Sequence, residues 1–253
     1  MIKFNKILSE IYFEDFPFED DYKKEYANLG PEINSDDNIF IPRRTKEEKD
    51  KKLLFRSYRI IRDYIKNGSQ GGLDLRGSPI EFLPKNLTEV NGNLILNGCK
   101  NLKSLPNNLT VNGGLDLEDC KNITSLPSGL KVKNNFSEFI LGTLWLTNTN
   151  ITELPLDLEV GYNIILNRTP IEKLPNNLIV HGSLNLGECK NITSLPTGLK
   201  IKYCLDLRNA KITKLPSDLE VEGSILLQST PLSNLSWNEI KKMIPKVKGD
   251  ILL

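Results

Sequence analysis

The side chains best suited to chemistry in this sequence are four cysteines and one histidine. Thiolates and imidazoles bind metals or act as nucleophile and base when their spacing brings them together. However, Cys99, Cys120 and Cys189 occur at one and the same position of an internal repeat, where other repeats have Thr149 or Thr169. We therefore expect these three cysteines to be small buried residues and not reactive thiols.

The single histidine, His181, lies beside Gly182 with no metal-ligand spacing and no adjacent nucleophile. A surface position is the expected role for this side chain. No other group of residues forms a catalytic constellation, and no glycine loop of the phosphate-binding kind is present. The sequence therefore predicts that the chain is not an enzyme and uses neither a cofactor nor a metal.

A repeat of about twenty-one residues runs from Gly71 to Leu253. It reads L-P-x-x-L-x-V-x-G-x-L-x-L, and its prolines are Pro84, Pro106, Pro127, Pro155, Pro175, Pro196 and Pro216. One repeat cannot fold alone, because its few apolar side chains do not offset the entropy lost by its backbone. Stacked repeats share their apolar faces, so the pattern predicts a solenoid.

Each repeat contains an L-x-L segment that alternates like a short β-strand, and nine such segments predict a parallel sheet. An L-x-V segment in each repeat predicts further extended structure on the far side. The residue between the paired leucines is expected to point to the concave face of the solenoid. These residues are Asp74, Ile95, Asp116, Trp145, Ile165, Asn185, Asp206, Leu226 and Leu252.

The pattern resembles the leucine-rich repeat family, in its short bacterial and bacteriophage form with Leu-Pro in place of a convex helix. The family consensus L-x-x-L-x-L-x-x-(N/C)-x-L maps onto Asn112 to Ile123 with one extra residue, and Cys120 takes the ladder site. The resemblance covers about 180 residues. It implies a leucine-rich repeat solenoid that is mainly β, and it names no partner, because this scaffold serves many functions.

Three regions follow from these patterns. Residues 1–42 form an acidic aromatic segment with four Lys/Arg against ten Asp/Glu, which is either a docking peptide or a strap on the basic helix that follows. Residues 43–70 are expected to be an N-terminal capping helix, and residues 71–253 the repeat array. Near the end of the array, Ser236 and Glu239 form a capping box that predicts a short C-terminal helix.

The concave face contains the candidate binding residues. An outward tryptophan next to Ile165 is unusual on a solvated strand and typical of protein interfaces, unless the protein itself covers it. Between Pro127 and Pro155 an insertion near residues 133–141 adds further aromatics, either as a binding loop or as a bulge that restores register. The predicted partner-binding residues are Asp116, Trp145, Ile165, Asn185, Asp206, Arg208, Phe136 and Phe139.

These features predict a non-catalytic module that binds a protein partner through its concave face and insertion loop. The alternative is a structural or self-assembling component of a larger particle, such as a phage virion. A net charge of +1 argues against nucleic-acid binding. No apolar stretch reaches the ~20 residues that span a bilayer, and the start lacks a signal peptide, so we expect no membrane partner. The expected location is the cytoplasm, or a host cytoplasm or virion if the chain is viral.

Overall fold

The computed structural model describes residues 45–135 and 141–253. The chain divides into two compact units, Met1–Leu53 and Leu54–Leu253. In the first unit only residues 45–53 are described, and they begin helix α3 (Lys46–Lys66). The predicted acidic segment 1–42 lies outside the described residues, and so do Phe136 and Phe139 of the insertion.

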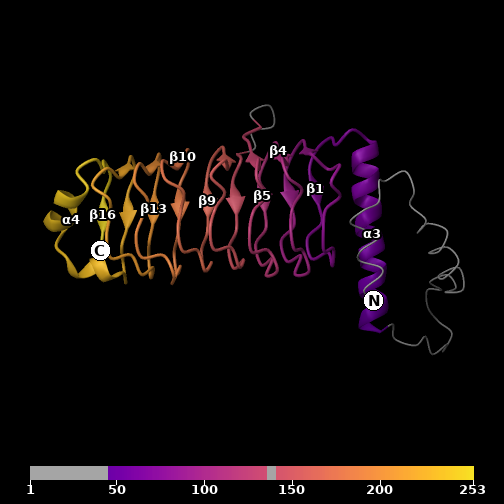
Figure 1. Cartoon of the computed structure of the whole chain (residues 1–253), viewed down its shortest axis with the longest axis horizontal. Helices are drawn as coiled ribbons and strands as arrows, with labels where there is room; N and C mark the ends of the chain where they lie inside the picture. Colours follow the sequence, from indigo (N-terminus) through magenta and orange to yellow (C-terminus); the bar gives the residue numbers. More distant parts are fainter. Residues whose placement is uncertain (1–44, 136–140) are drawn as a thin grey trace, which may run out of the picture. The chain divides into compact units, whose positions relative to one another are not determined.

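The second unit is a parallel β-solenoid, as predicted. Each turn of the chain, called a rung below, contributes one short strand to a nine-stranded sheet, and the strands stand side by side in chain order (Figure 1). Equivalent repeat positions face one another, as in the register Asp116↔Trp145↔Ile165. The strands are β1 (Leu73–Asp74), β3 (Leu94–Ile95), β5 (Leu115–Asp116), β7 (Leu144–Trp145), β9 (Ile164–Ile165), β11 (Leu184–Asn185), β13 (Leu205–Asp206), β15 (Ile225–Leu226) and β16 (Ile251–Leu252).

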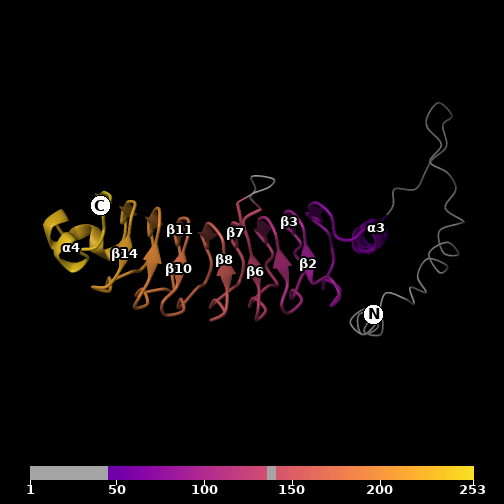
Figure 2. The same cartoon turned by 90° about the horizontal axis from the view of Figure 1, so that it is seen from above.

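The L-x-V segments form a second row of strands on the opposite side of the rungs, as Figure 2 shows from above. This second face is not one sheet. It splits into a four-stranded sheet and a three-stranded sheet, and the division lies between β8 and β10. The strands are β2 (Glu89–Val90), β4 (Thr110–Val111), β6 (Lys131–Val132) and β8 (Glu159–Val160), then β10 (Ile179–Val180), β12 (Lys200–Ile201) and β14 (Glu220–Val221).

The interior is filled by the paired leucines of the L-x-L segments. In the second and third rungs, Leu94, Leu96, Leu115 and Leu117 are all fully buried. Because successive side chains of a strand point to opposite sides, the residue between each pair lies on the outer surface of the nine-stranded sheet. Core packing therefore takes the repeated apolar positions and leaves the outward positions available for contacts.

Three cysteines form part of this core, in agreement with the prediction. The Sγ of Cys99 donates to the carbonyl of Leu75 in the preceding rung at 3.1 Å, and Cys120 and Cys189 repeat the contact in their own rungs. Burial raises the pKa of the Cys99 thiol to about 11 and that of Cys120 to about 12. A buried thiol that stays protonated is a poor nucleophile.

Both predicted helices are present. Within the second unit, the α3 side chain Ile61 is fully buried, and the hydroxyl of Tyr58 donates to the Phe82 carbonyl at 3.4 Å. After β15, a 3₁₀ turn η1 (Pro231–Asn234) leads to helix α4 (Trp237–Met243). The predicted capping box of Ser236 and Glu239 is present at the start of α4.

This core predicts a simple thiol titration. Cys204 is the exposed cysteine, whereas the other three are buried and hydrogen-bonded to carbonyls. We expect Ellman's reagent to react rapidly with one thiol in the native chain and with four after unfolding in guanidinium. The Cys204→Ser variant should lose the rapid phase. Rapid reaction of two or more thiols in the native protein would contradict the burial of the other three cysteines.

Candidate protein-binding surface

The outward surface of the nine-stranded sheet, called the nine-stranded face below, holds the predicted column of residues. Trp145 lies near its middle, between Asp116 on β5 and Ile165 on β9. Trp145 is 37% exposed, although tryptophan has one of the largest apolar side chains that a protein can bury. Ile165 beside it is half-buried, so the two side chains form an apolar patch that solvent reaches.

The indole of Trp145 packs on a glycine in the neighbouring rung, and this contact is called the seat of Trp145 below. A Cβ added to Gly114 would lie 2.5 Å from Cζ3 of Trp145, so the six-membered ring rests directly on the glycine backbone. Gly114 is itself fixed, because its N–H donates to Oδ1 of Asn93 at 2.7 Å. The protein therefore covers one side of the indole and leaves the rest open, which answers in part whether Trp145 is covered by its own chain.

Acidic side chains flank the patch on one side. Asp116 and Glu118 are half-buried, and among the described residues neither forms an ion pair. Burial raises the pKa of Glu118 above its usual range, and the nearby charges of Asp116 and Asp119 raise it further. A raised carboxyl pKa means that the charged form of Glu118 is less favourable here than in water. A cation placed here by a partner would offset the smaller contribution, the repulsion from Asp116 and Asp119.

Several polar residues of the column have a local structural role. The side-chain oxygen of Asp116 accepts the N–H of Glu118 at 3.0 Å, and Asn185 accepts the N–H of Gly187 at 2.9 Å. Such bonds to the residue two positions on are Asx turns, and they end the strand by satisfying a backbone donor. Asp116 and Asn185 are thus tied to the backbone and still partly exposed.

Asp206 differs from the prediction, which treated it as an accessible binding residue. It is 6% exposed, and its two carboxylate oxygens accept from Nε and Nη2 of Arg208 at 3.0 and 2.7 Å. Asp74 makes the same bidentate pair with Arg76 but stays exposed, because it lies on β1, the first strand of the sheet. Neighbouring strands on both sides bury Asp206, so its contribution is to position Arg208, whose side chain remains 53% exposed.

The insertion is anchored at its described base. Oδ1 of Asn134 accepts the N–H of Gly142 at 2.7 Å, and Nδ2 of the same side chain donates to the Gly161 carbonyl at 3.1 Å. One asparagine therefore closes the loop and ties it to the next rung. Leu141, at the end of the insertion, is exposed.

Among the described residues, no group of three or more His, Cys, Asp or Glu side chains could hold a metal ion. His181 is exposed, as expected. None of the helices in the described part of the chain has the length and apolar character to cross a membrane. No protein-family model and no curated protein sequence matches the chain.

The seat of Trp145 gives a spectroscopic prediction. Gly114→Ala should force the indole away from β5, because the new methyl group would overlap its ring. In a Trp237→Phe background Trp145 is the single tryptophan, and we expect its emission to shift to the red and its quenching by acrylamide to increase. Gly187→Ala is the matched control, since its Cβ would meet the side chains of Asn167 and Asn185 and no aromatic ring. Unchanged emission in the Gly114→Ala variant would show that the indole does not rest there.

Proposed function

We propose that the chain is a non-catalytic protein-binding module that engages one protein partner through the nine-stranded face around Trp145. The observation that carries the proposal is that the indole of Trp145 packs on Gly114 and is still partly exposed to solvent. Its ring rests on Gly114, so little rotamer entropy remains to be lost on binding, and the residue is 37% exposed to a partner. Aromatic side chains at the centre of an interface commonly dominate its affinity.

The surroundings of Trp145 suggest the chemistry of the partner. Ile165 extends the apolar surface on one side, and Asp116 with Glu118 provides negative charge on the other. A complementary surface would place a lysine or arginine beside an apolar pocket that admits the indole. Arg208 lies further along the face and offers the opposite charge to an acidic group of the same partner.

The family, source and cellular location of the chain are also part of this proposal. The Leu-Pro repeat resembles leucine-rich repeat proteins of bacterial and bacteriophage type, and such solenoids use extended faces for binding. A bacterial or phage protein that acts in the cytoplasm is consistent with the sequence composition. The family and the source are supported by resemblance alone, whereas the proposed binding face is supported by the packing and exposure of Trp145.

Partner capture tests the proposal. The tagged full chain would be used to isolate proteins from lysate of the source organism, with identification by mass spectrometry. Trp145→Ala should lose the partner, with a cost of about 2 kcal/mol or more, on the order of 30-fold in Kd. Trp237→Ala removes a more exposed tryptophan side chain, from a residue that is 50% exposed on α4, and should bind normally. Retention of the partner by Trp145→Ala would rule out this face.

Self-assembly is the alternative, and the C-terminal edge of the sheet is the observation that favours it. β16 pairs with β15 alone among the described strands, and its Leu252 is 44% exposed. Light scattering after size exclusion separates the two functions. Our proposal predicts a monomer at micromolar concentration, while concentration-dependent oligomers that Leu252→Asp abolishes would favour the structural role.

A further inference from the structure

The second face is interrupted at one place, and this seam between β8 and β10 has no counterpart elsewhere in the described rows of strands. At an intact step, the N–H groups of Lys200 and Lys202 donate to the carbonyls of Leu178 and Val180. The equivalent bonds from Ile179 and His181 to the carbonyls of Leu158 and Val160 are not formed.

Four backbone groups are consequently left without a protein partner in the described structure. They are the N–H groups of Ile179 and His181 and the carbonyls of Leu158 and Val160. On the nine-stranded face the same two rungs remain joined, because Ile164 donates to the Ser183 carbonyl at 3.0 Å and Leu166 to that of Asn185 at 2.8 Å. The seam is therefore open on one side of the solenoid and closed on the other.

Two side chains at the seam also differ in type from the residues at the equivalent positions of the other repeats. Ile179 is 55% exposed, whereas the equivalent residue of every other strand in the second row is polar. Those residues are Glu89, Thr110, Lys131, Glu159, Lys200 and Glu220. Leu156 is 90% exposed, whereas the equivalent residue after each of the other repeat prolines is polar. Those residues are Lys85, Asn107, Ser128, Asn176, Thr197 and Ser217.

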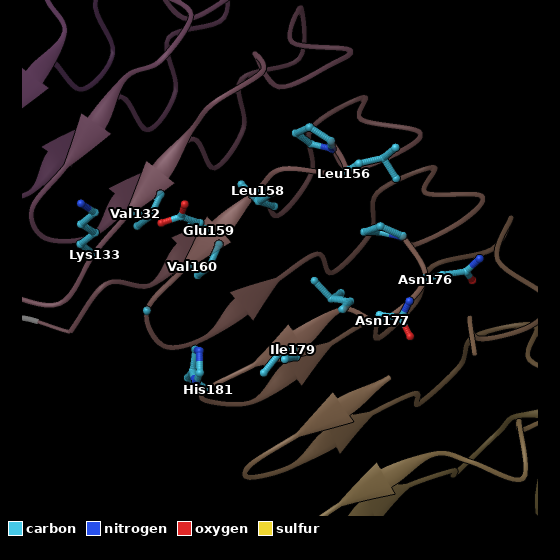
Figure 3. Close-up of a pocket in the computed structure, with 14 residues that line it drawn as sticks. Val132, Lys133, Leu156, Leu158, Glu159, Val160, Asn176, Asn177, Ile179 and His181 are labelled. Carbon is cyan, nitrogen blue, oxygen red and sulfur yellow. The ribbon is translucent and has the colours of Figure 1, made fainter. Parts of the chain in front are cut away.

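These departures border one cavity of about 380 Å³. Figure 3 shows Leu156 and Asn176 toward one end of it and Lys133 and His181 toward the other. Glu159 lies along the same cavity, and its charge is balanced by Lys131 at 2.6 Å. The end that holds Lys133 and His181 therefore favours an acidic group, while at the opposite end the exposed Leu156 lies near the polar side chains of Asn176 and Asn177.

We propose that this seam binds an extended polypeptide segment of a partner protein, parallel to the rungs, with branched apolar side chains and an acidic residue at its C-terminal end. The main chain of the segment supplies the acceptors and donors that the four unpaired groups lack, as in β-strand addition. Its apolar side chains cover Leu156 and Ile179, and its carboxylate lies beside Lys133 and His181. The seam and Trp145 lie on opposite faces, so this proposal does not depend on the function proposed above.

The inference rests on three features that occur at one place: the interrupted ladder, the exposed Leu156 and the exposed Ile179. Exposed apolar residues occur singly on most proteins and need no explanation. Here the two apolar exceptions in otherwise polar columns meet at the one interruption of the backbone ladder in the described strands. An unpaired strand edge is a template for another chain, and apolar side chains beside it provide the specificity of such binding.

The test uses the full chain and a capped heptapeptide, Asn-Asn-Leu-Ile-Val-Glu-Gly, which repeats residues 176–182 with glutamate in place of the histidine. Calorimetry should detect binding, and amide exchange at Ile179 and His181 should slow on peptide addition. The control peptide carries N-methyl groups on its isoleucine and glutamate, which removes the two hydrogens that would donate to Leu158 and Val160. That peptide should not bind. Equal binding of both peptides, or no binding of the first, overturns the proposal.

A protein variant tests the side-chain contribution. Ile179→Lys restores the residue type found at Lys200, so we expect it to fold normally and to bind the peptide about tenfold more weakly or worse. Leu252→Lys changes an exposed leucine on the nine-stranded face and should bind as the unmodified chain does. Unchanged affinity in Ile179→Lys overturns the proposal. Protection of the Ile179 amide in a dimer of the free chain would also overturn it, because the occupant would then be a second copy.

Discussion

The hydrogen-bond ladder between successive rungs is the constraint on which the rest of this structure depends. One rung has too few apolar side chains to fold alone, and it becomes stable only when the next rung covers it and accepts its backbone donors. On the nine-stranded face every rung does this through bonds such as Leu94 N–H to the Gly114 carbonyl at 2.9 Å. The ladder fixes the register, and the register assigns each side chain to the core or to the surface.

Because the ladder fixes the position of most residues, the candidate functional features are the places that depart from the repeat pattern. Trp145 replaces a smaller outward residue, and the glycine that seats it lies in another rung, so the pair depends on the register that joins them. The seam is an exception of a different kind. There the ladder itself is interrupted on one face while the other face holds the two rungs together, which leaves backbone groups unpaired without unfolding the array.

Periodicity was sufficient to predict the core and the parallel strands, because those follow from position within the repeat. The helices follow from other signals, such as the capping box of Ser236 and Glu239 at the start of α4. It was insufficient for contacts between rungs. The burial of Asp206 arises from its neighbours on two other strands, and the contact of Trp145 with Gly114 crosses from one rung to the next. The seam was equally hidden, since Val160 and Val180 are twenty residues apart, and so are Ile201 and Val221, whose ladder is intact. Apolar exceptions at Leu156 and Ile179 were the signal available in the sequence.

The central claim is that a continuous ladder on one face coexists with an interrupted ladder on the other, and residue-resolved amide hydrogen exchange of the free chain tests it most directly. The account predicts slow exchange at Leu94, Leu115 and Leu184 on the nine-stranded face and at Lys200 and Lys202 on the second face. Fast exchange is predicted at Ile179 and His181. If these two amides are protected as strongly as those of Lys200 and Lys202, the ladder is closed and the account is wrong.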